Sequence, residues 1–110
     1  MWDSQAFEAH FSDQEEEMPT YVMLTNLTAD GVKTLKSNPT RVSEVNKEVE
    51  ALGAKVIDQY AVLGRFDFIT VVEAPDPETM AKVSVELGSR GTMTSETLMA
   101  IPADKFADSI

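Results

Sequence analysis

Two apolar stretches, each long enough for a β-strand, flank Gly64-Arg65 and constrain the fold of this chain more than any other feature. They run from about 55 to 63 and from about 66 to 73. Glycine tolerates the positive φ that the first position of a two-residue type II′ hairpin turn requires. Gly64-Arg65 is therefore predicted to be a hairpin turn that places Leu63 opposite Phe66.

Both faces of this predicted hairpin carry apolar side chains. An antiparallel sheet that has helices on one side only usually shows polar residues on the other side, because that side meets water. We therefore expect one face to meet helices and the other to meet a partner subunit or a ligand. The residues expected to meet the helices are Val22, Leu24, Ile69, Val71, Leu98 and Ala100. The open face is expected to hold Tyr21, Met23, Thr25, Gln59, Phe66, Phe68, Thr70, Thr97 and Met99.

The rest of the chain adds strands and helices around the hairpin. Strand patterns at about 20–27 and 93–101 stand at the two ends, and helical patterns at about 30–52 and 76–88 lie between them and the hairpin. The order strand, helix, strand, strand, helix, strand is typical of the split βαβ arrangement. We expect an α+β, ferredoxin-like βαββαβ fold with a four-stranded antiparallel sheet and two helices on one face, which oligomerises through its open sheet face.

The first helical pattern contains a proline. Pro39 lacks a backbone N–H and disfavours helix at Asn38, so the helix is predicted to break there. Asn38 is expected to cap the second piece. In the later helix, Asp76 is the expected cap, with Pro77 in the first turn and the end near Gly88.

Charge and composition exclude several classes of function. The net charge is -10, the nine basic residues are scattered, and there is no cysteine. Nucleic-acid binding relies on clustered basic residues, and disulfides and zinc-thiolate sites need cysteine. No apolar run approaches the roughly 20 residues of a membrane-spanning helix. We expect a cytoplasmic protein with no cofactor and no affinity for nucleic acid or membranes.

The N-terminal residues differ in charge from the rest: residues 1–18 hold six acidic residues and no Lys or Arg. They also contain Trp2, Phe7 and Phe11, and the last two are four apart, so a helix would place them on one side. This pattern favours a docking peptide for a protein partner, and the alternative is an extension without a partner. The lone histidine, His10, has no neighbouring ligand for a metal. The expected boundaries are an extension over 1–17, a domain over 18–101 and a C-terminal tail over 102–110.

Four segments together resemble the GYD domain family. They are 18–22 (MPTYV), 63–68 (LGRFDF), 74–76 (APD) and 91–98 (GTMTSETL), with Phe66 where the family name has tyrosine. The resemblance implies a ferredoxin-like domain of the dimeric α/β barrel group, in which sheets from two or more subunits enclose a cavity. It implies no activity, because that group includes monooxygenases, isomerases, haem enzymes and binding modules.

Candidate site residues cluster at the hairpin and on the expected open face. Asp67 either orients a ligand or accepts backbone hydrogen bonds at the turn, and Arg65 either pairs with an anion or stays exposed. Polar groups that would serve an intersubunit cavity are Tyr21, Thr25, Gln59, Tyr60, Thr70 and Thr97, while Met23, Phe66, Phe68 and Met99 would supply apolar contacts.

No nucleophile with a base, phosphate loop or paired carboxylates of catalytic spacing is evident in the sequence. The sequence therefore favours a non-catalytic homo-oligomeric interaction module, an accessory or regulatory subunit whose tail docks a partner. The alternative is a small cofactor-free enzyme, similar to a monooxygenase or isomerase, or a ligand-binding protein for a hydrophobic metabolite in an intersubunit cavity.

Overall fold

The structure is a computed structural model and describes residues 18–110. Trp2, Phe7, His10 and Phe11 lie outside the described residues, so the docking role of the tail stays a prediction. Within the described part the elements are β1 (Thr20–Leu27), α2 (Ala29–Ser37), α3 (Arg41–Ala51), β2 (Lys55–Ala61), β3 (Phe68–Glu73), α4 (Pro77–Gly88), β4 (Met93–Ala100) and α5 (Ala103–Ser109).

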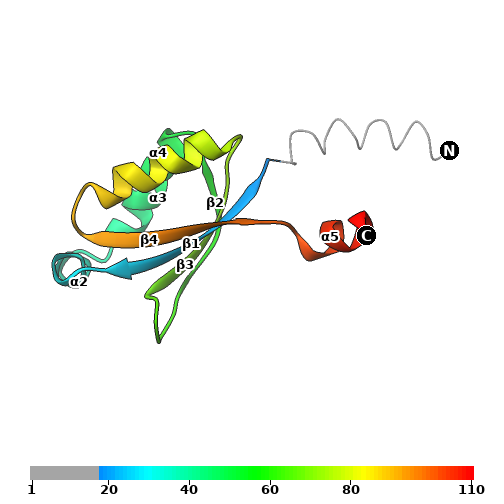
Figure 1. Cartoon of the computed structure of the whole chain (residues 1–110). Helices are drawn as coiled ribbons and strands as arrows, with labels where there is room; N and C mark the ends of the chain where they lie inside the picture. Colours follow the sequence, from blue (N-terminus) through cyan, green and yellow to red (C-terminus); the bar gives the residue numbers. More distant parts are fainter. Residues whose placement is uncertain (1–17) are drawn as a thin grey trace.

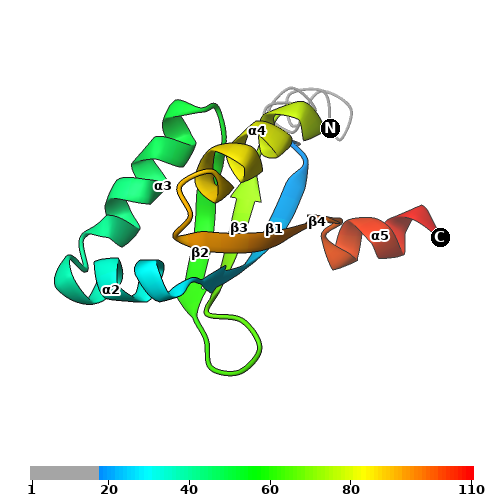
Figure 2. The ribbon, with the colours of Figure 1, turned by 60° about the vertical axis from the view of Figure 1, so that its left-hand side comes forward.

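The four strands form one antiparallel sheet in the order β2-β3-β1-β4. Helices α3 and α4 both lie on one face of this sheet, and α2 lies at the end of the sheet where β1 finishes (Figure 1). Helix α5 projects away from the other elements, as the turned view in Figure 2 also shows. The predicted α+β class with a four-stranded antiparallel sheet is confirmed, and the arrangement is consistent with a ferredoxin-like fold.

The helical pattern breaks where predicted. Helix α2 ends at Ser37 and α3 begins at Arg41, so Pro39 lies between them. The predicted cap is wrong, because Asn38 closes α2, its N–H bonding to the Thr34 carbonyl oxygen at 2.9 Å. The next two residues form a turn, and the second helix starts later than expected. In α4, by contrast, Asp76 caps as predicted, accepting the Thr79 N–H at 2.8 Å.

The core lies between the sheet and helices α3 and α4. Val49 of α3 and Val83 of α4 are buried against the sheet. The sheet contributes the side chains that the sequence analysis placed on the open face, so that assignment is wrong. Tyr21, Met23, Thr25, Thr70 and Val72 are buried on the helix side, whereas Val22, Leu24, Ile69, Val71 and Leu98 are half-buried or exposed on the other.

The reversal has a simple physical origin. Alternation fixes which residues share a face, and from Asp58 onward the shared faces are as predicted, because Gln59 pairs with Thr70 and Ala61 with Phe68. Before Asp58 a register shift breaks the alternation and pairs Val56 with Val72. Which of the two faces meets the helices depends on the handedness of the crossovers and on which residues of β1 hydrogen-bond to which neighbour. The pattern of apolar residues contains neither piece of information when both faces are apolar.

The hairpin is also longer at its tip than predicted. Strand β2 ends at Ala61 and β3 begins at Phe68, and the last backbone bond runs from the Val62 N–H to the Asp67 carbonyl oxygen at 2.9 Å. Asp67 is held instead by β1, since its own N–H donates to the Thr25 carbonyl oxygen at 2.8 Å. The connection is therefore a wider loop than the predicted two-residue turn, although Gly64 has the expected positive φ, 116°.

Candidate functional site

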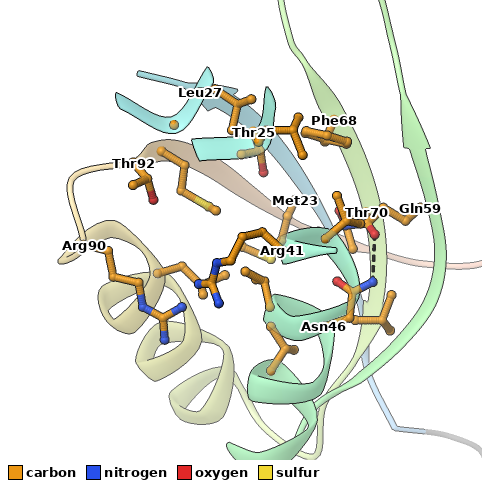
Figure 3. A pocket seen from close by; sticks show the side chains of 18 of the residues that line it. Met23, Thr25, Leu27, Arg41, Asn46, Gln59, Phe68, Thr70, Arg90 and Thr92 are labelled. Atoms are coloured by element: carbon orange, nitrogen blue, oxygen red, sulfur yellow. Dashed lines mark hydrogen bonds between the residues drawn. The ribbon is translucent and has the colours of Figure 1, made fainter. Parts of the chain in front are cut away.

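A cavity of about 250 Å³ lies between the sheet and the helices α2 and α3. Its walls are mostly apolar and come from every layer of the domain: Met23, Leu35, Val45, Phe68, Leu87 and Met93 are among them. Figure 3 shows side chains of the lining, Met23 and Phe68 among them, arranged around a common space. Small-molecule sites have this composition, apolar walls with a few placed polar groups, although most are larger.

Three polar side chains are linked along one wall of the cavity. The Asn46 Nδ2 donates to the Gln59 Oε1 at 2.8 Å, and the Gln59 Nε2 donates to the Thr70 Oγ1 at 3.0 Å. This chain joins α3 to β2 and β3, so it fixes the orientation of both amides. Both hydrogen bonds are partly buried, and together they hold this wall in a defined arrangement.

Thr25 is the most buried of the polar wall residues whose side chains have no hydrogen bond within residues 18–110. Thr25 lies on β1, lines this space and is 6 % exposed. Its hydroxyl makes no hydrogen bond to any residue from 18 to 110. Figure 3 shows the hydroxyl oxygen on the cavity side of the strand. A hydroxyl that lines a mostly apolar space without a protein partner is available to a ligand or a water molecule.

Two arginines stand at the rim of the cavity and share one carboxylate. Arg41 of α3 and Arg90, in the α4–β4 connection, both bond to Glu48, and Arg41 does so at 3.4 Å. Arg41 also pairs with Glu44 at 3.0 Å, and Arg90 with Glu86 at 3.2 Å. The hydrogen bond from Arg90 lowers the pKa of Glu48 below its ordinary value. Three carboxylates thus neutralise two guanidinium groups, and the rim carries no surplus positive charge.

Asp67 lies near this site but performs a structural task. Its Oδ2 accepts the backbone N–H of Leu27 at 2.8 Å, so the carboxylate ties the loop after β2 to the end of β1. This is the second of the two roles that the sequence left open, with β1 rather than the turn as the partner. Arg65 stacks on Phe66, with its guanidinium carbon 5.1 Å from the ring centroid, at the loop tip.

The second candidate surface is the sheet face that no helix covers, which we call the open face. It consists of Val22, Leu24, Tyr60, Ile69, Val71 and Leu98. Tyr60 is 60 % and Leu98 is 43 % exposed, and acidic Asp58 and Glu96 stand on the two edge strands. An apolar band across four strands is unusual for a surface that stays in water.

The structure divides the predicted site residues among several places. Met23, Thr25, Gln59, Phe68 and Thr70 come together, but around the cavity inside one chain rather than at an intersubunit cavity. The others do not join them: Tyr21 is buried with an unpaired hydroxyl, Thr97 bonds to Ser84, Met99 is 63 % exposed, Tyr60 is on the open face, and Arg65 and Phe66 are in the loop.

Sequence reasoning missed Arg41, Asn46 and Arg90. Asn46 gave a readable signal, because it is four residues after Val42 and therefore falls within the apolar stripe of α3. A polar residue on such a stripe indicates a buried polar contact. The sequence around the two arginines contains no such signal, because their shared pairing with Glu48 forms only when α3 lies beside the α4–β4 connection.

The described part of the chain offers neither a metal cluster nor a membrane-spanning helix. Residues 18–110 contain no group of three or more His, Asp or Glu side chains placed to hold a metal ion. None of the described helices has the length and apolarity needed to cross a bilayer.

Solved structures with a similar fold support the architecture. The protein TTHA0845 from Thermus thermophilus superposes with a TM-score of 0.50 at 24% identity, covering 77% of this chain and 95% of that one. MtbAldR (Rv2779c) gives 0.59 at 21%, covering 76% of this chain and 52% of that one. The hypothetical protein PHS023 from Pyrococcus horikoshii gives 0.51 at 23%, covering 77% and 92%. At these identities the likeness concerns the fold alone.

Sequence comparison is more specific. A Thermus thermophilus protein named "Glutamine synthetase and cystathionine beta-lyase binding protein" is 51% identical over 92 residues, which is 82% of this chain and 97% of that protein. The model of the GYD domain matches residues 21–110. Together with the segments around Gly64 and Thr97 that carry the resemblance, this match shows that the chain belongs to the GYD domain family.

Proposed function

We propose that this chain is a non-catalytic interaction module that associates with itself through its open face and binds other proteins. The observation that carries the proposal is the apolar open face, which the helices leave uncovered. A relative of 51% identity bears the name of a binding protein for two enzymes, and that name supports the same class of function.

Burial of the open face accounts for self-association. Leu24 and Val22 of the central strand lie beside Ile69 and Val71, so a second sheet packed on them would remove a continuous apolar band from water. Sheets pack face to face at about 10 Å through such residues. The acids Asp58 and Glu96 lie at the edges of the band, where they stay solvated in a two-sheet assembly.

The first partners to test are glutamine synthetase and cystathionine β-lyase of the organism that supplies this chain. Full-length protein is immobilised, and each purified enzyme is passed over it in an interferometry experiment. Saturable binding of either enzyme supports the interaction role. If neither binds at tens of micromolar, the assignment of these two partners is overturned, and self-association is judged by the next experiment.

Self-association is tested with Leu98→Lys, which places a charge within the open face. The matched control is Val85→Lys on the outer side of α4, where Val85 is 71% exposed. Light scattering is expected to show an oligomer for the wild type and the control and a monomer for Leu98→Lys. A wild-type monomer at micromolar concentration contradicts the proposal.

The N-terminal residues contribute a separate part of the proposal. Trp2, Phe7 and Phe11 are proposed to provide the docking contact for a protein partner, and the acids around them keep the segment soluble. Deleting residues 1–17 is then expected to weaken enzyme binding and to leave the oligomeric state unchanged. Unchanged enzyme binding removes the docking role of this segment.

A further inference from the structure

The cavity between the sheet and helices α2 and α3 is the feature that self-association and protein binding leave unused. It lies on the opposite side of the sheet from the open face, so covering the open face does not fill it. The space of about 250 Å³ is partly open to solvent and has mostly apolar walls, so an apolar molecule in it would gain contacts that water does not provide. Such a space is well suited to a ligand.

The size of the cavity limits the ligand to a small molecule. An apolar cavity of about 150 Å³ holds benzene, so the larger space here accommodates a monocyclic ring with a substituent or a short chain. Met23, Phe68 and Met93 line it, and methionine adapts well to the face or edge of an aromatic ring.

The charges around the cavity exclude an ionic ligand. Within residues 18–110, the lining carries no charged side chain besides Arg41 and Arg90, and burying an unpaired charge against the apolar remainder is unfavourable. The cations that this part of the chain places on the lining, Arg41 and Arg90, are already bonded to Glu44, Glu48 and Glu86. An anion would have to displace these carboxylates, in a chain whose net charge is already -10.

Thr25 supplies the recognition of a polar group. The residue is 6 % exposed and lines the cavity, and its hydroxyl has no hydrogen-bond partner among residues 18–110. Asn46, Gln59 and Thr70 use their side chains on one another and so hold the adjacent wall in place. We infer that the cavity is a binding site for an uncharged, mainly apolar molecule of one ring or a short chain, whose single hydroxyl or carbonyl group bonds to Thr25.

The test uses phenol as the probe, with toluene and benzoate as comparisons of similar size. Phenol has the hydroxyl, toluene lacks it, and benzoate carries a charge. Titration of the full chain, followed by two-dimensional NMR, is expected to show saturable phenol binding in the millimolar range, with shifts at Met23, Phe68 and Met93. Toluene is expected to bind more weakly and benzoate the most weakly.

Three variants locate the site. Thr25→Val removes the hydroxyl at constant shape and is expected to weaken phenol binding about fivefold, the effect of one hydrogen bond, and to leave toluene unchanged. Thr94→Val, at an exposed position of β4 outside the cavity, is the matched control. Val45→Phe fills the space and is expected to abolish the binding of phenol and of toluene. If Val45→Phe does not fold, Val42→Phe is used as the cavity-filling variant.

Three results would overturn the inference. They are the absence of saturable phenol binding to the wild type, equal phenol affinity of the wild type and Thr25→Val, and tighter binding of benzoate than of phenol. None of these measurements involves an enzyme partner or the oligomeric state. The ligand site and the proposed interaction role therefore stand or fall separately.

Discussion

At the scale of single residues, Asp67 illustrates how a candidate functional group becomes a structural one. Its carboxylate accepts the Leu27 N–H at 2.8 Å, a partly buried hydrogen bond to a charged group. Removing it with Asp67→Ala is expected to lower the free energy of unfolding by about 2 kcal/mol. Asp67→Asn keeps an acceptor oxygen and is expected to lose less than half of that. Urea denaturation measures both, and equal stability of all three proteins would contradict the role.

Alanine is expected to have opposite effects on stability at the two helical glycines, Gly31 and Gly88. A Cβ on Gly31 would lie 2.0 Å from the backbone oxygen of Thr92, whereas a Cβ on Gly88 would meet nothing within 4 Å. Gly31→Ala is expected to destabilise the fold by at least about 2 kcal/mol, because the backbone of the α4–β4 connection must move. Gly88→Ala is expected to stabilise it by about 0.5 kcal/mol through reduced freedom of the unfolded chain. Thermal unfolding of the pair gives the comparison, and a stable Gly31→Ala variant would show that this close approach is not needed.

Some of these residues were identifiable from sequence and others were not. The turn region around Gly64 and the candidate Asp67 follow from local composition, and so does the capping role of Asp76. The close approach at Gly31 and the pairing of Arg90 with Glu48 join residues more than 40 positions apart. No local pattern encodes such contacts, because they form only when the layers pack.

At the scale of elements, strands and helices were predicted closely because each has a periodic pattern and a chemical boundary. Strand β1 and helix α4 have the expected extents, and Pro39 separates α2 from α3. The orientation of the sheet was predicted in reverse. The helix face and the open face are both apolar, so their composition could not say which of them the helices cover.

One salt-bridge cluster fastens two elements together, and it gives a pH-dependent prediction. Glu48 of α3 bonds to Arg90, and this bond lowers the pKa of Glu48 from its ordinary value of 4.5. A carboxyl group with a lowered folded-state pKa contributes stability that is present above the unfolded-state pKa and is lost as the pH falls through the folded-state pKa.

Glu48→Gln is therefore expected to be less stable than the wild type at pH 6 to 8. The difference is expected to shrink progressively as the pH falls below about 4.5. Urea midpoints measured at several pH values give the comparison. Glu50→Gln, at an exposed position of the same helix, is the matched control and is expected to follow the wild type. A Glu48→Gln difference that is constant down to pH 2 would contradict the role of the charge.

At the scale of the whole molecule, the fold separates two surfaces with different tasks. The helix side contains the cavity, and the open face presents the apolar band that self-association would bury. Because the sheet lies between them, a substitution on one surface leaves the other intact. Leu98→Lys and Thr25→Val are therefore independent probes of the assembly and of the ligand site, and their effects are expected to be additive.

Helix α5 belongs to neither surface within one chain. All of its residues are exposed, and it projects away from the sheet (Figure 2). Phe106 and Ile110 are four residues apart and are 54 % and 92 % exposed. Under the proposed self-association, we expect a second copy to cover these two side chains. Deleting residues 103–110 is then expected to weaken the oligomer at least tenfold.

The same deletion in the Leu98→Lys background measures the contribution of α5 to the stability of the monomer. Because α5 buries no residue, the free energy of unfolding is expected to change by less than about 0.5 kcal/mol there. Light scattering over a dilution series measures the first effect, and urea denaturation measures the second. The double substitution of Phe106 and Ile110 by alanine is the matched full-length variant and is expected to reproduce the loss of association. A large loss of monomer stability would instead mean that α5 packs on its own domain, and the oligomer would then have to form through the open face alone.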